Sequence, residues 1–398
     1  MDQKPQQLDG ALLKDIAVRT ERLRDSARAV GAQAMLVTCL SNLIYTTGTI
    51  YNGYYYLPVD GDPIHFVIKT GAFIHKNTEF IRKPELILDL LAARGMRPPA
   101  AMLIEDTQIS YSEAQRLQKV FPDTKFLPAS NLLRELRSVK SDYEISIATE
   151  GSRRMTDVFR RLPSVIKSGM TDLDLQIEFE YLLRRNGHLG LIRTYGRYME
   201  VHNGQILVGE NAISPTPYVF AIGGGGLDRA MPVGANHTTF SEGVSALVDF
   251  AGNFFGYVVD MSRTFSIGKP PENAVAAHNA SLEIQDMVIM QTIPGAVCGD
   301  IYDNAVKIAV ERGFGEFFMG YGQQSKFIAH GVGLELNELP VIAQNSKTVI
   351  REGMIIAVEP KFTLPGYGAV GTENTFVVRK DGLEKLTIHD DNIIEILG

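Results

Sequence analysis

The sequence predicts a mixed α/β fold divided into two domains. The chain has 398 residues, and chains of this length usually divide into two or more domains, each with its own hydrophobic core. Before residue 138, short apolar strand-like runs alternate with helical stretches. After it, longer helices flank segments rich in strands and turns. We therefore expect an α/β (α+β) protein with a small domain over residues 1–138 and a larger domain over residues 139–398.

The N-terminal region predicts a sheet covered by helices. Helical patterns are expected at 17–30, 85–94 and 112–120, and strands at 34–38 and 101–104. Three consecutive tyrosines, Tyr54, Tyr55 and Tyr56, allow two interpretations. They form either an exposed aromatic patch with a substrate or dimer role, or part of the buried core.

The C-terminal region begins with two helix-start signals. Ser141-x-x-Glu144 and Thr171-x-x-Asp174 are capping-box patterns, which predict helices to about residues 162 and 185. Further helices are expected at 273–292 and 300–312, and the segments 215–268 and 349–396 are rich in strands and turns. The four glycines of 223–226 are followed by Pro232 rather than by a helix pattern. A simple glycine turn, or a loop near the active centre, is therefore favoured over a nucleotide-binding loop.

Composition excludes several functional classes. The chain is 45% hydrophobic and 21% charged with a net charge of −7, as in ordinary globular proteins. The sequence lacks the basic stripe that is typical of proteins that bind nucleic acid. It also lacks an uncharged apolar run long enough to cross a membrane. The N-terminus lacks a signal-peptide pattern, and the two cysteines form no disulfide or metal pattern. These features predict a cytoplasmic protein that binds neither nucleic acid nor membrane.

Two aspartates lie in consecutive apolar, β-prone runs. Asp249 follows residues 246–248 and Asp260 follows residues 256–259, with Gly252, Asn253 and Gly256 as candidate turn residues. A hairpin centred between residues 254 and 255 would place the two aspartates directly opposite, with Cβ atoms about 4.5–5.5 Å apart. Carboxylates that close in an apolar environment repel each other unless a cation lies between them. The alternative is a pair of solvated acids at a hairpin rim.

Three more candidate ligands follow in the chain. Glu359 ends one strand-like run and Glu373 precedes another, while His330 lies between the small residues Ala329 and Gly331. Each taken singly is consistent with an ordinary structural residue. Together with the aspartates they form a set rich in oxygen, which suits Mn²⁺, Zn²⁺, Co²⁺ or Fe²⁺.

In these motifs the chain closely resembles the pita-bread metallohydrolases, which include prolidase, aminopeptidase P, methionine aminopeptidase and creatinase. The family's ligand order of Asp, Asp, His, Glu, Glu matches the contexts LVDF, VVDMS, HGVG, AVEP and GTEN, and the resemblance covers almost the whole chain. It implies a creatinase/prolidase-type N-terminal domain, a pita-bread catalytic domain and a homodimer. It also implies two divalent metal ions held by Asp249, Asp260, His330, Glu359 and Glu373.

Four positions depart from the family pattern. Asn337 and Lys326 replace histidines on either side of the metal-binding histidine. A further histidine is missing near Pro232, and Gly371 replaces the arginine of proline-specific members. Because such groups stabilise the oxyanion, and losing one typically lowers the rate about 10²–10³-fold, these replacements argue against a proline-peptide activity but not against metal binding.

The resemblance implies an Xaa-Pro dipeptidase or aminopeptidase that uses a metal-bridging hydroxide. Glu359 would transfer the proton, Asn337 would donate a hydrogen bond, and Lys326 would bind a substrate carboxylate or the oxyanion. Lys326 is equally consistent with a surface charge. Two alternatives remain: a non-peptidase metal-dependent hydrolase or lyase acting on a small molecule, and a non-catalytic binding protein.

Overall fold

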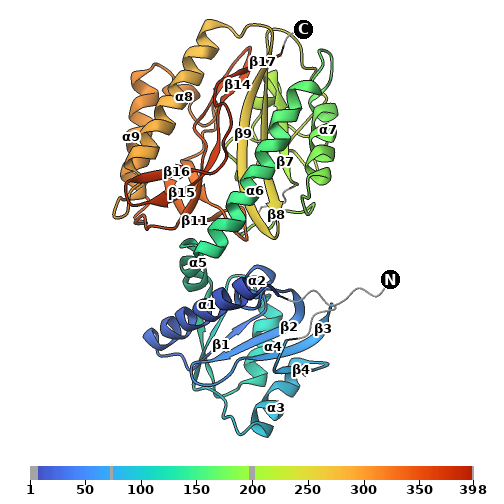
Figure 1. Ribbon diagram of the computed structural model, residues 1–398, viewed down its shortest axis with the longest axis vertical. Coiled ribbons are helices and arrows are strands. Elements are labelled where there is room, and N and C mark those ends of the chain that lie inside the picture. The colour runs from blue at the N-terminus through green and yellow to red at the C-terminus, as the bar shows by residue number, and fades with distance from the viewer. Residues whose placement is uncertain (1–7, 72–74, 197–201, 397–398) are drawn as a thin grey trace. The chain divides into compact units, whose positions relative to one another are not determined.

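The computed structural model describes residues 8–71, 75–196 and 202–396, in two compact units, Met1–Arg137 and Ser138–Gly398. The division lies one residue before the boundary expected from the sequence. Both units combine helices with sheets, so the predicted mixed α/β class is confirmed (Figure 1). Within the described residues, no helix is long and apolar enough to span a membrane.

The N-terminal unit contains a six-stranded mixed sheet in the order β4-β3-β2-β1-β5-β6. β1 lies at its centre, antiparallel to β2 and parallel to β5. The strands are β1 (Ala34–Val37), β2 (Tyr51–Pro58), β3 (Ile64–Thr70), β4 (Thr78–Phe80), β5 (Ala101–Ile104) and β6 (Lys125–Pro128). The helices of this part of the chain are α1 (Gly10–Ala29), α2 (Leu40–Thr47), α3 (Ile87–Ala93), α4 (Tyr111–Val120) and α5 (Ser130–Ser138).

The three tyrosines lie in β2 and are buried. Tyr54, Tyr55 and Tyr56 are 5%, 2% and 2% exposed, and Tyr54 and Tyr56 pack in the core with residues of β1 and β3. The expectation of an exposed aromatic patch is therefore wrong, and the core interpretation is confirmed. The reason is that strand side chains stand on the faces of the sheet, and Tyr54 and Tyr56 lie on a face where they pack with Leu91 of α3 and Leu117 of α4.

A buried histidine of the N-terminal unit makes stability depend on pH. His65 is 6% exposed, stacks on His75 at 4.1 Å between ring centroids and lies 3.1 Å from the Tyr51 hydroxyl. Burial, together with the nearby His75, lowers the pKa of His65 to about 3. The unfolded chain therefore binds more protons than the folded chain between about pH 6.5 and 3. Stability is complete above this window and is lost as the pH falls through it.

We predict that the free energy of unfolding of the N-terminal unit falls by about 1.4 kcal/mol for each step of one in pH below pH 6.5. Hydrogen exchange of peptides from β2 and β3 measures it in the full chain. His65→Gln should flatten that pH dependence, while peptides of the C-terminal unit should respond as in the unaltered protein. An equal slope in both proteins would contradict the role of His65.

The C-terminal unit is built from helices around three sheets (Figure 1). The sheets have the orders β17-β9-β8-β7, β11-β10-β12-β15-β16 and β13-β14. The strands are β7 (Gly204–Val208), β8 (Ser245–Phe254), β9 (Tyr257–Ile267), β10 (Phe327–Gly331), β11 (Glu338–Ala343), β12 (Ile355–Val358), β13 (Lys361–Leu364), β14 (Gly368–Gly371), β15 (Asn374–Arg379), β16 (Gly382–Lys385) and β17 (Ile394–Ile396). The helices are α6 (Asp142–Arg161), α7 (Asp172–Arg185), α8 (Glu272–Gln291) and α9 (Cys298–Glu311).

Both capping boxes form as predicted. The side chain of Ser141 accepts a hydrogen bond from the Glu144 amide at the start of α6, and Thr171 does the same for Asp174 at the start of α7. These caps satisfy amide groups that have no partner within the helix.

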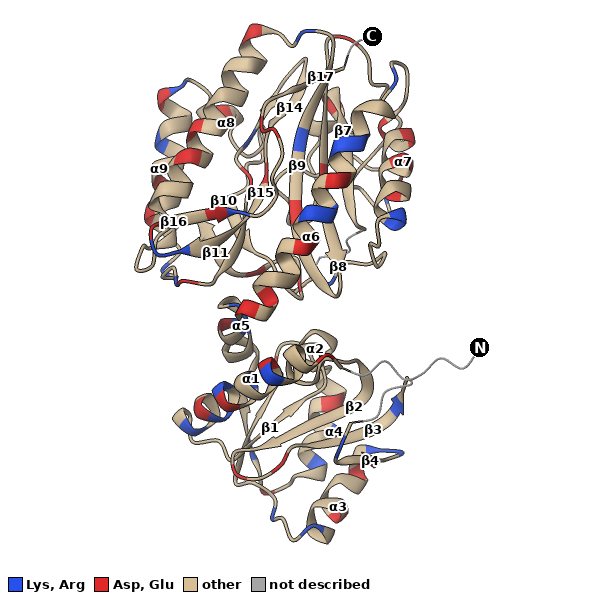
Figure 2. Ribbon diagram, viewed as in Figure 1, with Lys and Arg blue, Asp and Glu red and all other residues tan. Residues whose placement is uncertain are grey.

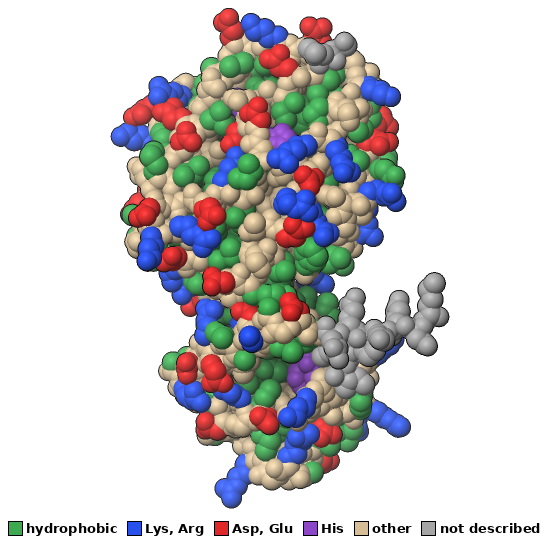
Figure 3. Space-filling view, viewed as in Figure 1, with side chains coloured by type: hydrophobic (Ala, Val, Ile, Leu, Met, Phe, Trp, Pro, Cys, Tyr) green, Lys and Arg blue, Asp and Glu red, His purple; other side chains and the backbone are tan. Residues whose placement is uncertain are grey.

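Two hydrophobic clusters hold the sheets in place. One joins α6 and α7 to β7, β8 and β9, with Phe179 and Phe250 at 4.5 Å between ring centroids. The other joins α8 and α9 to β10, β12, β13 and β15. Lys, Arg, Asp and Glu lie mainly on helices and loops (Figure 2). Over the visible face of the C-terminal unit, side chains of both charge signs are interspersed (Figure 3).

Candidate metal centre

Asp249 and Asp260 lie on the β8-β9 hairpin, but not in the predicted register. Asp249 pairs with Ser262 and Asp260 pairs with Ala251, so the expectation that the aspartates are directly opposite is wrong. The turn consists of Phe255 and Gly256, with φ angles of 57° and 89°. Positive φ at both central residues is the requirement of a type I′ turn, which matches the twist of the strands.

The shift leaves both aspartates on one face of the sheet. The turn lies one residue later than expected, so each cross-strand partner changes by two positions. A shift of two preserves the alternation of side chains, whereas a shift of one would reverse it. Asp249 and Asp260 are therefore diagonal neighbours. Gly252 and Asn253 belong to β8 rather than to the turn.

The second sheet supplies the other three predicted ligands. His330 lies on β10, Glu359 follows β12 directly, and Glu373 precedes β15. β12 pairs with both of its neighbours, and the Glu359 amide donates to the Ile328 carbonyl at 2.9 Å. Two backbone hydrogen bonds between Ser262 and Glu373 then join this sheet to β9. That junction brings the two halves of the site together.

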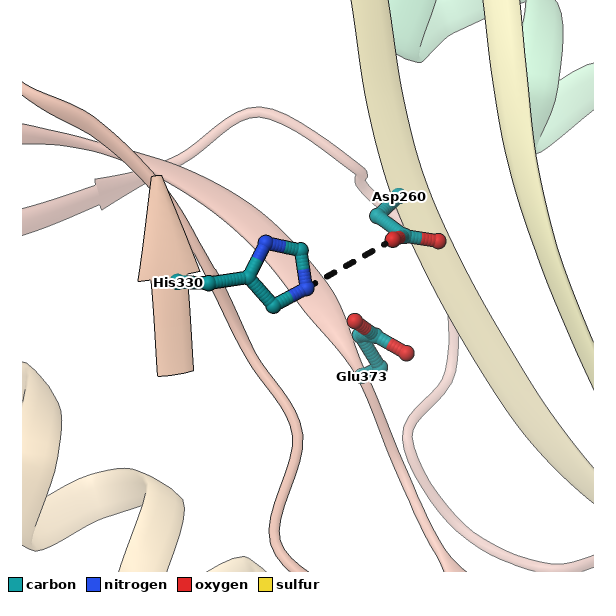
Figure 4. Close-up of side chains that lie close together, drawn as sticks. All are labelled: Asp260, His330 and Glu373. Carbon is teal, nitrogen blue, oxygen red and sulfur yellow. Dashed lines mark ion pairs between the residues drawn. The ribbon is translucent and has the colours of Figure 1, made fainter. Parts of the chain in front are cut away.

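All five predicted ligands converge in two overlapping groups. Ligand atoms lie within 4.8 Å of one another in the groups Asp260, His330, Glu373 and Asp249, Glu359, Glu373. The Nε2 atom of His330 is 3.8 Å from Oδ2 of Asp260 and 3.6 Å from Oε1 of Glu359. Figure 4 shows His330, Asp260 and Glu373 pointing toward one another from different segments of the chain.

Burial makes this cluster unfavourable without a cation. Asp260, Glu359 and Glu373 are 6%, 4% and 1% exposed. Burial and then the charge of Asp249 raise the pKa of Asp260 well above its usual range, and burial and then Asp260 do the same for Glu373. Oε1 of Glu373 is buried without a hydrogen-bond partner within the described residues. Three buried carboxylates, one of them with an oxygen that lacks a partner, and an imidazole fit a divalent cation.

The sequence did not identify Lys361, which lies inside the cluster. Its ammonium is fully buried and contacts Oδ2 of Asp249 at 2.8 Å, Oε2 of Glu359 at 2.7 Å and Oε2 of Glu373 at 2.9 Å. Burial lowers the pKa of Lys361, but the three carboxylates outweigh it, so that its pKa is raised well above the usual value. The available signal was its place two residues after Glu359, in the strand that follows Pro360.

Asn337 uses its side chain to hold a neighbouring loop. Its Oδ1 accepts from the Tyr195 amide at 2.7 Å, and its Nδ2 donates to the Tyr195 carbonyl at 2.6 Å. Both polar atoms are therefore engaged by one backbone unit. This geometry favours a positioning role over direct donation to a substrate, and the catalytic role expected of Asn337 stays a prediction.

Lys326 is exposed and lies at a pocket next to the cluster. The pocket has a volume of about 290 Å³, and its lining includes Pro215, Tyr218, Phe220 and Phe327. Phe327 also makes an edge contact with the His330 ring, at 6.3 Å between centroids. Phe327 therefore lies between the pocket and His330, and Lys326 supplies a cationic side chain in the pocket wall.

Pro232, the glycine run 223–226 and Gly371 contact residues in their own neighbourhood. Pro232 is half-buried, and its carbonyl accepts from the Thr216 hydroxyl at 2.8 Å. No helix follows the glycine run 223–226, whose residue Gly225 donates to Asn211 at 2.8 Å and whose residue Gly223 lines the pocket. Gly371 lies directly opposite Lys361 in the β13-β14 pair.

Comparisons with known proteins agree with this architecture. Residues 147–380 match the family model of metallopeptidase family M24, and residues 19–139 match that of the creatinase/prolidase N-terminal domain. An Xaa-Pro dipeptidase from Pyrococcus horikoshii is 26% identical over 290 residues, covering 73% of this chain and 74% of the relative. One from Pyrococcus furiosus is 25% identical over 353 residues, covering 87% and 90%.

Solved structures give the same fold. The structure of an Xaa-Pro dipeptidase from Bacillus anthracis superposes with a TM-score of 0.78 at 22% identity, covering 96% of this chain and 99% of that one. An X-Pro aminopeptidase from Thermotoga maritima gives 0.77 at 20% identity, covering 95% and 99%. The predicted combination of a creatinase/prolidase-type domain and a pita-bread domain is thereby confirmed.

Proposed function

Since this chain belongs to metallopeptidase family M24, a family of hydrolases, we propose that it is a metal-dependent Xaa-Pro peptidase acting on short peptides. The convergence of buried Asp260, Glu359 and Glu373 on His330 carries the proposal, because it forms a preorganised site for a divalent ion. Retention of the complete predicted ligand set argues against a purely non-catalytic binding protein. The names of the Xaa-Pro dipeptidases that this chain resembles support the choice of substrate.

A divalent ion, when bound, lowers the pKa of a water molecule toward neutrality and polarises the scissile carbonyl. Asp260, His330 and Glu373 would hold it, and Mn²⁺, Zn²⁺, Co²⁺ or Fe²⁺ suits such donors. Glu359 would accept the proton of the nucleophilic water and return it to the leaving amine. Its Oε1 faces His330, while its Oε2 is held by Lys361.

The pocket beside Phe327 would receive the C-terminal side of the peptide. Its proline and aromatic lining suits an apolar ring, and Lys326 would pair with the terminal carboxylate. The resemblance to prolidases further leads us to propose a cytoplasmic homodimer. None of these assignments requires nucleic acid or membrane as a partner.

A dipeptide panel tests the proposed function. Protein loaded with Mn²⁺ or another of these metals is expected to release amino acids from Ala-Pro and Leu-Pro, and more slowly from Ala-Leu. A lack of cleavage with every metal and peptide would overturn the peptidase assignment. The second candidate is a hydrolase or lyase that acts on a small molecule. It would then gain support from the two hydrogen bonds between Asn337 and the Tyr195 backbone, which replace the contact of a peptidase histidine.

Lys326→Met is expected to raise KM about 10-fold or more for dipeptides with a free carboxylate, since a hydrogen bond to a charged group contributes about 1.5–3 kcal/mol. C-terminally amidated dipeptides should show no such change. The matched control is Lys307→Met, which removes another exposed lysine, on α9. Equal KM values for Lys326→Met and the control would contradict the proposed contact.

A further inference from the structure

We propose that the ammonium of Lys361 occupies the position of a second cation, so that the centre binds one divalent ion rather than two. This inference rests on the metal site proposed above and assigns its composition. The ion would lie among Asp260, His330 and Glu373, beside Oε1 of Glu359. The ammonium fills the neighbouring position among Asp249, Glu359 and Glu373.

The first argument is the match between donors and acceptors. A lysine ammonium carries three N–H donors and no acceptor. Lys361 has three carboxylate oxygens at 2.7–2.9 Å, one from each member of the group Asp249, Glu359 and Glu373. Each of these residues is a member of a potential metal-binding group. The ammonium therefore uses all of its donors on the same side chains that would otherwise hold an ion.

The second argument is steric. A transition-metal ion binds carboxylate oxygens at about 2.0–2.2 Å, so an ion held by the same three residues would occupy the volume of the Lys361 Nζ atom. Lys361 has no exposed surface, and its strand β13 is paired to β14. The ammonium therefore has no contact with solvent while it holds the three carboxylates. Two cations in one position would also repel strongly in a buried site.

The third argument comes from the residue opposite Lys361. A Cβ atom at Gly371 would lie 2.5 Å from the Pro360 carbonyl oxygen and 3.0 Å from Cγ of Lys361, and its φ of 148° disfavours other residues. The absence of a side chain at Gly371 leaves room for the lysine stem on its way to the carboxylates. Lys361 and Gly371 thus form one cross-strand unit.

The first position remains available for an ion. The two oxygens of Glu373 have different surroundings: Oε2 accepts a hydrogen bond from Lys361, whereas the buried Oε1 has no hydrogen-bond partner within the described residues. His330 and Asp260 point toward each other (Figure 4), whereas the ion pairs of the ammonium are with Asp249, Glu359 and Glu373. Lys361 therefore partitions the four carboxylates between itself and a single ion.

Metal stoichiometry tests the proposal independently of catalysis. The full chain is saturated with Mn²⁺, desalted and assayed by elemental analysis, and Mn²⁺ electron paramagnetic resonance distinguishes an isolated ion from a coupled pair. We expect one isolated ion per chain. Lys361→Ala is expected to bind two coupled ions, and Lys361→Arg, which retains a cation, is expected to bind one. Lys307→Met is the surface control and should also bind one.

Two ions or none in the unaltered protein would overturn the proposal, as would one ion in folded Lys361→Ala. If Lys361→Ala does not fold, the aspartates provide a second test. Asp249→Asn should retain one ion, while Asp260→Asn should weaken Mn²⁺ binding by more than the roughly 10–100-fold that is typical when a group that only orients a ligand is lost. Loss of the ion in both variants would contradict the partition. If the unaltered protein binds one ion but cleaves no peptide, only the proposed function is refuted. If it cleaves peptides and binds two ions, only this inference is refuted.

Discussion

His330→Ala is expected to remove the bound ion and to lower dipeptide hydrolysis by at least about 10³-fold. His330 is the imidazole of the first metal-binding group, and its Nε2 atom faces both Asp260 and Glu359. Without it, the buried carboxylates keep their mutual repulsion but lose the imidazole nitrogen of the ligand group. Metal content and the rate of Ala-Pro cleavage, measured on the same preparation, check this result.

His237→Asn is the matched control. His237 is exposed and has a φ of 70°, a backbone conformation that asparagine tolerates well. This variant is expected to keep its metal and its activity. Full metal content and full activity in His330→Ala would mean that the ion is held elsewhere.

Arg263→Met is expected to lower the free energy of unfolding by about 3–5 kcal/mol, the usual effect of breaking a buried ion pair by removing one partner. The Arg263 guanidinium is fully buried and pairs with Asp391 at 2.8 Å. It also donates to the Glu373 carbonyl at 2.8 Å and to Oδ1 of Asn374 at 2.9 Å. Burial lowers the pKa of Arg263 to about 10, while Asp391 opposes that effect.

The same contacts fix the backbone that presents Glu373 to the metal site. Arg263→Met should therefore also weaken Mn²⁺ binding about 10–100-fold, as is typical when a group that orients a ligand is lost. Chemical denaturation and Mn²⁺ titration measure the two effects. The control is Arg312→Met, because the exposed pair of Arg312 with Glu283 should contribute less than about 1 kcal/mol. Similar losses in both variants would refute the role of Arg263.

The elements that were predicted best depend on local chemistry. Ser141 and Thr171 cap their helices as expected, because a capping box involves residues only three positions apart. The register of the β8-β9 hairpin was predicted incorrectly, because Gly252 and Asn253 resemble turn residues as much as Phe255 and Gly256 do. Pairing over the full length of the strands decides between these turns, and a short sequence window does not contain it.

The sequence by itself determined the family resemblance, the order of the five candidate ligands and the mixed α/β class. Each of these follows from residue type and spacing along the chain. Only the tertiary structure decided the surroundings of those ligands. It buried Tyr54–Tyr56 in the core, engaged Asn337 with Tyr195 and placed the ammonium of Lys361 among three carboxylates. The physical reason is that an electrostatic contact depends on distance in space, and strands remote in sequence set that distance for Lys361 and Asp249.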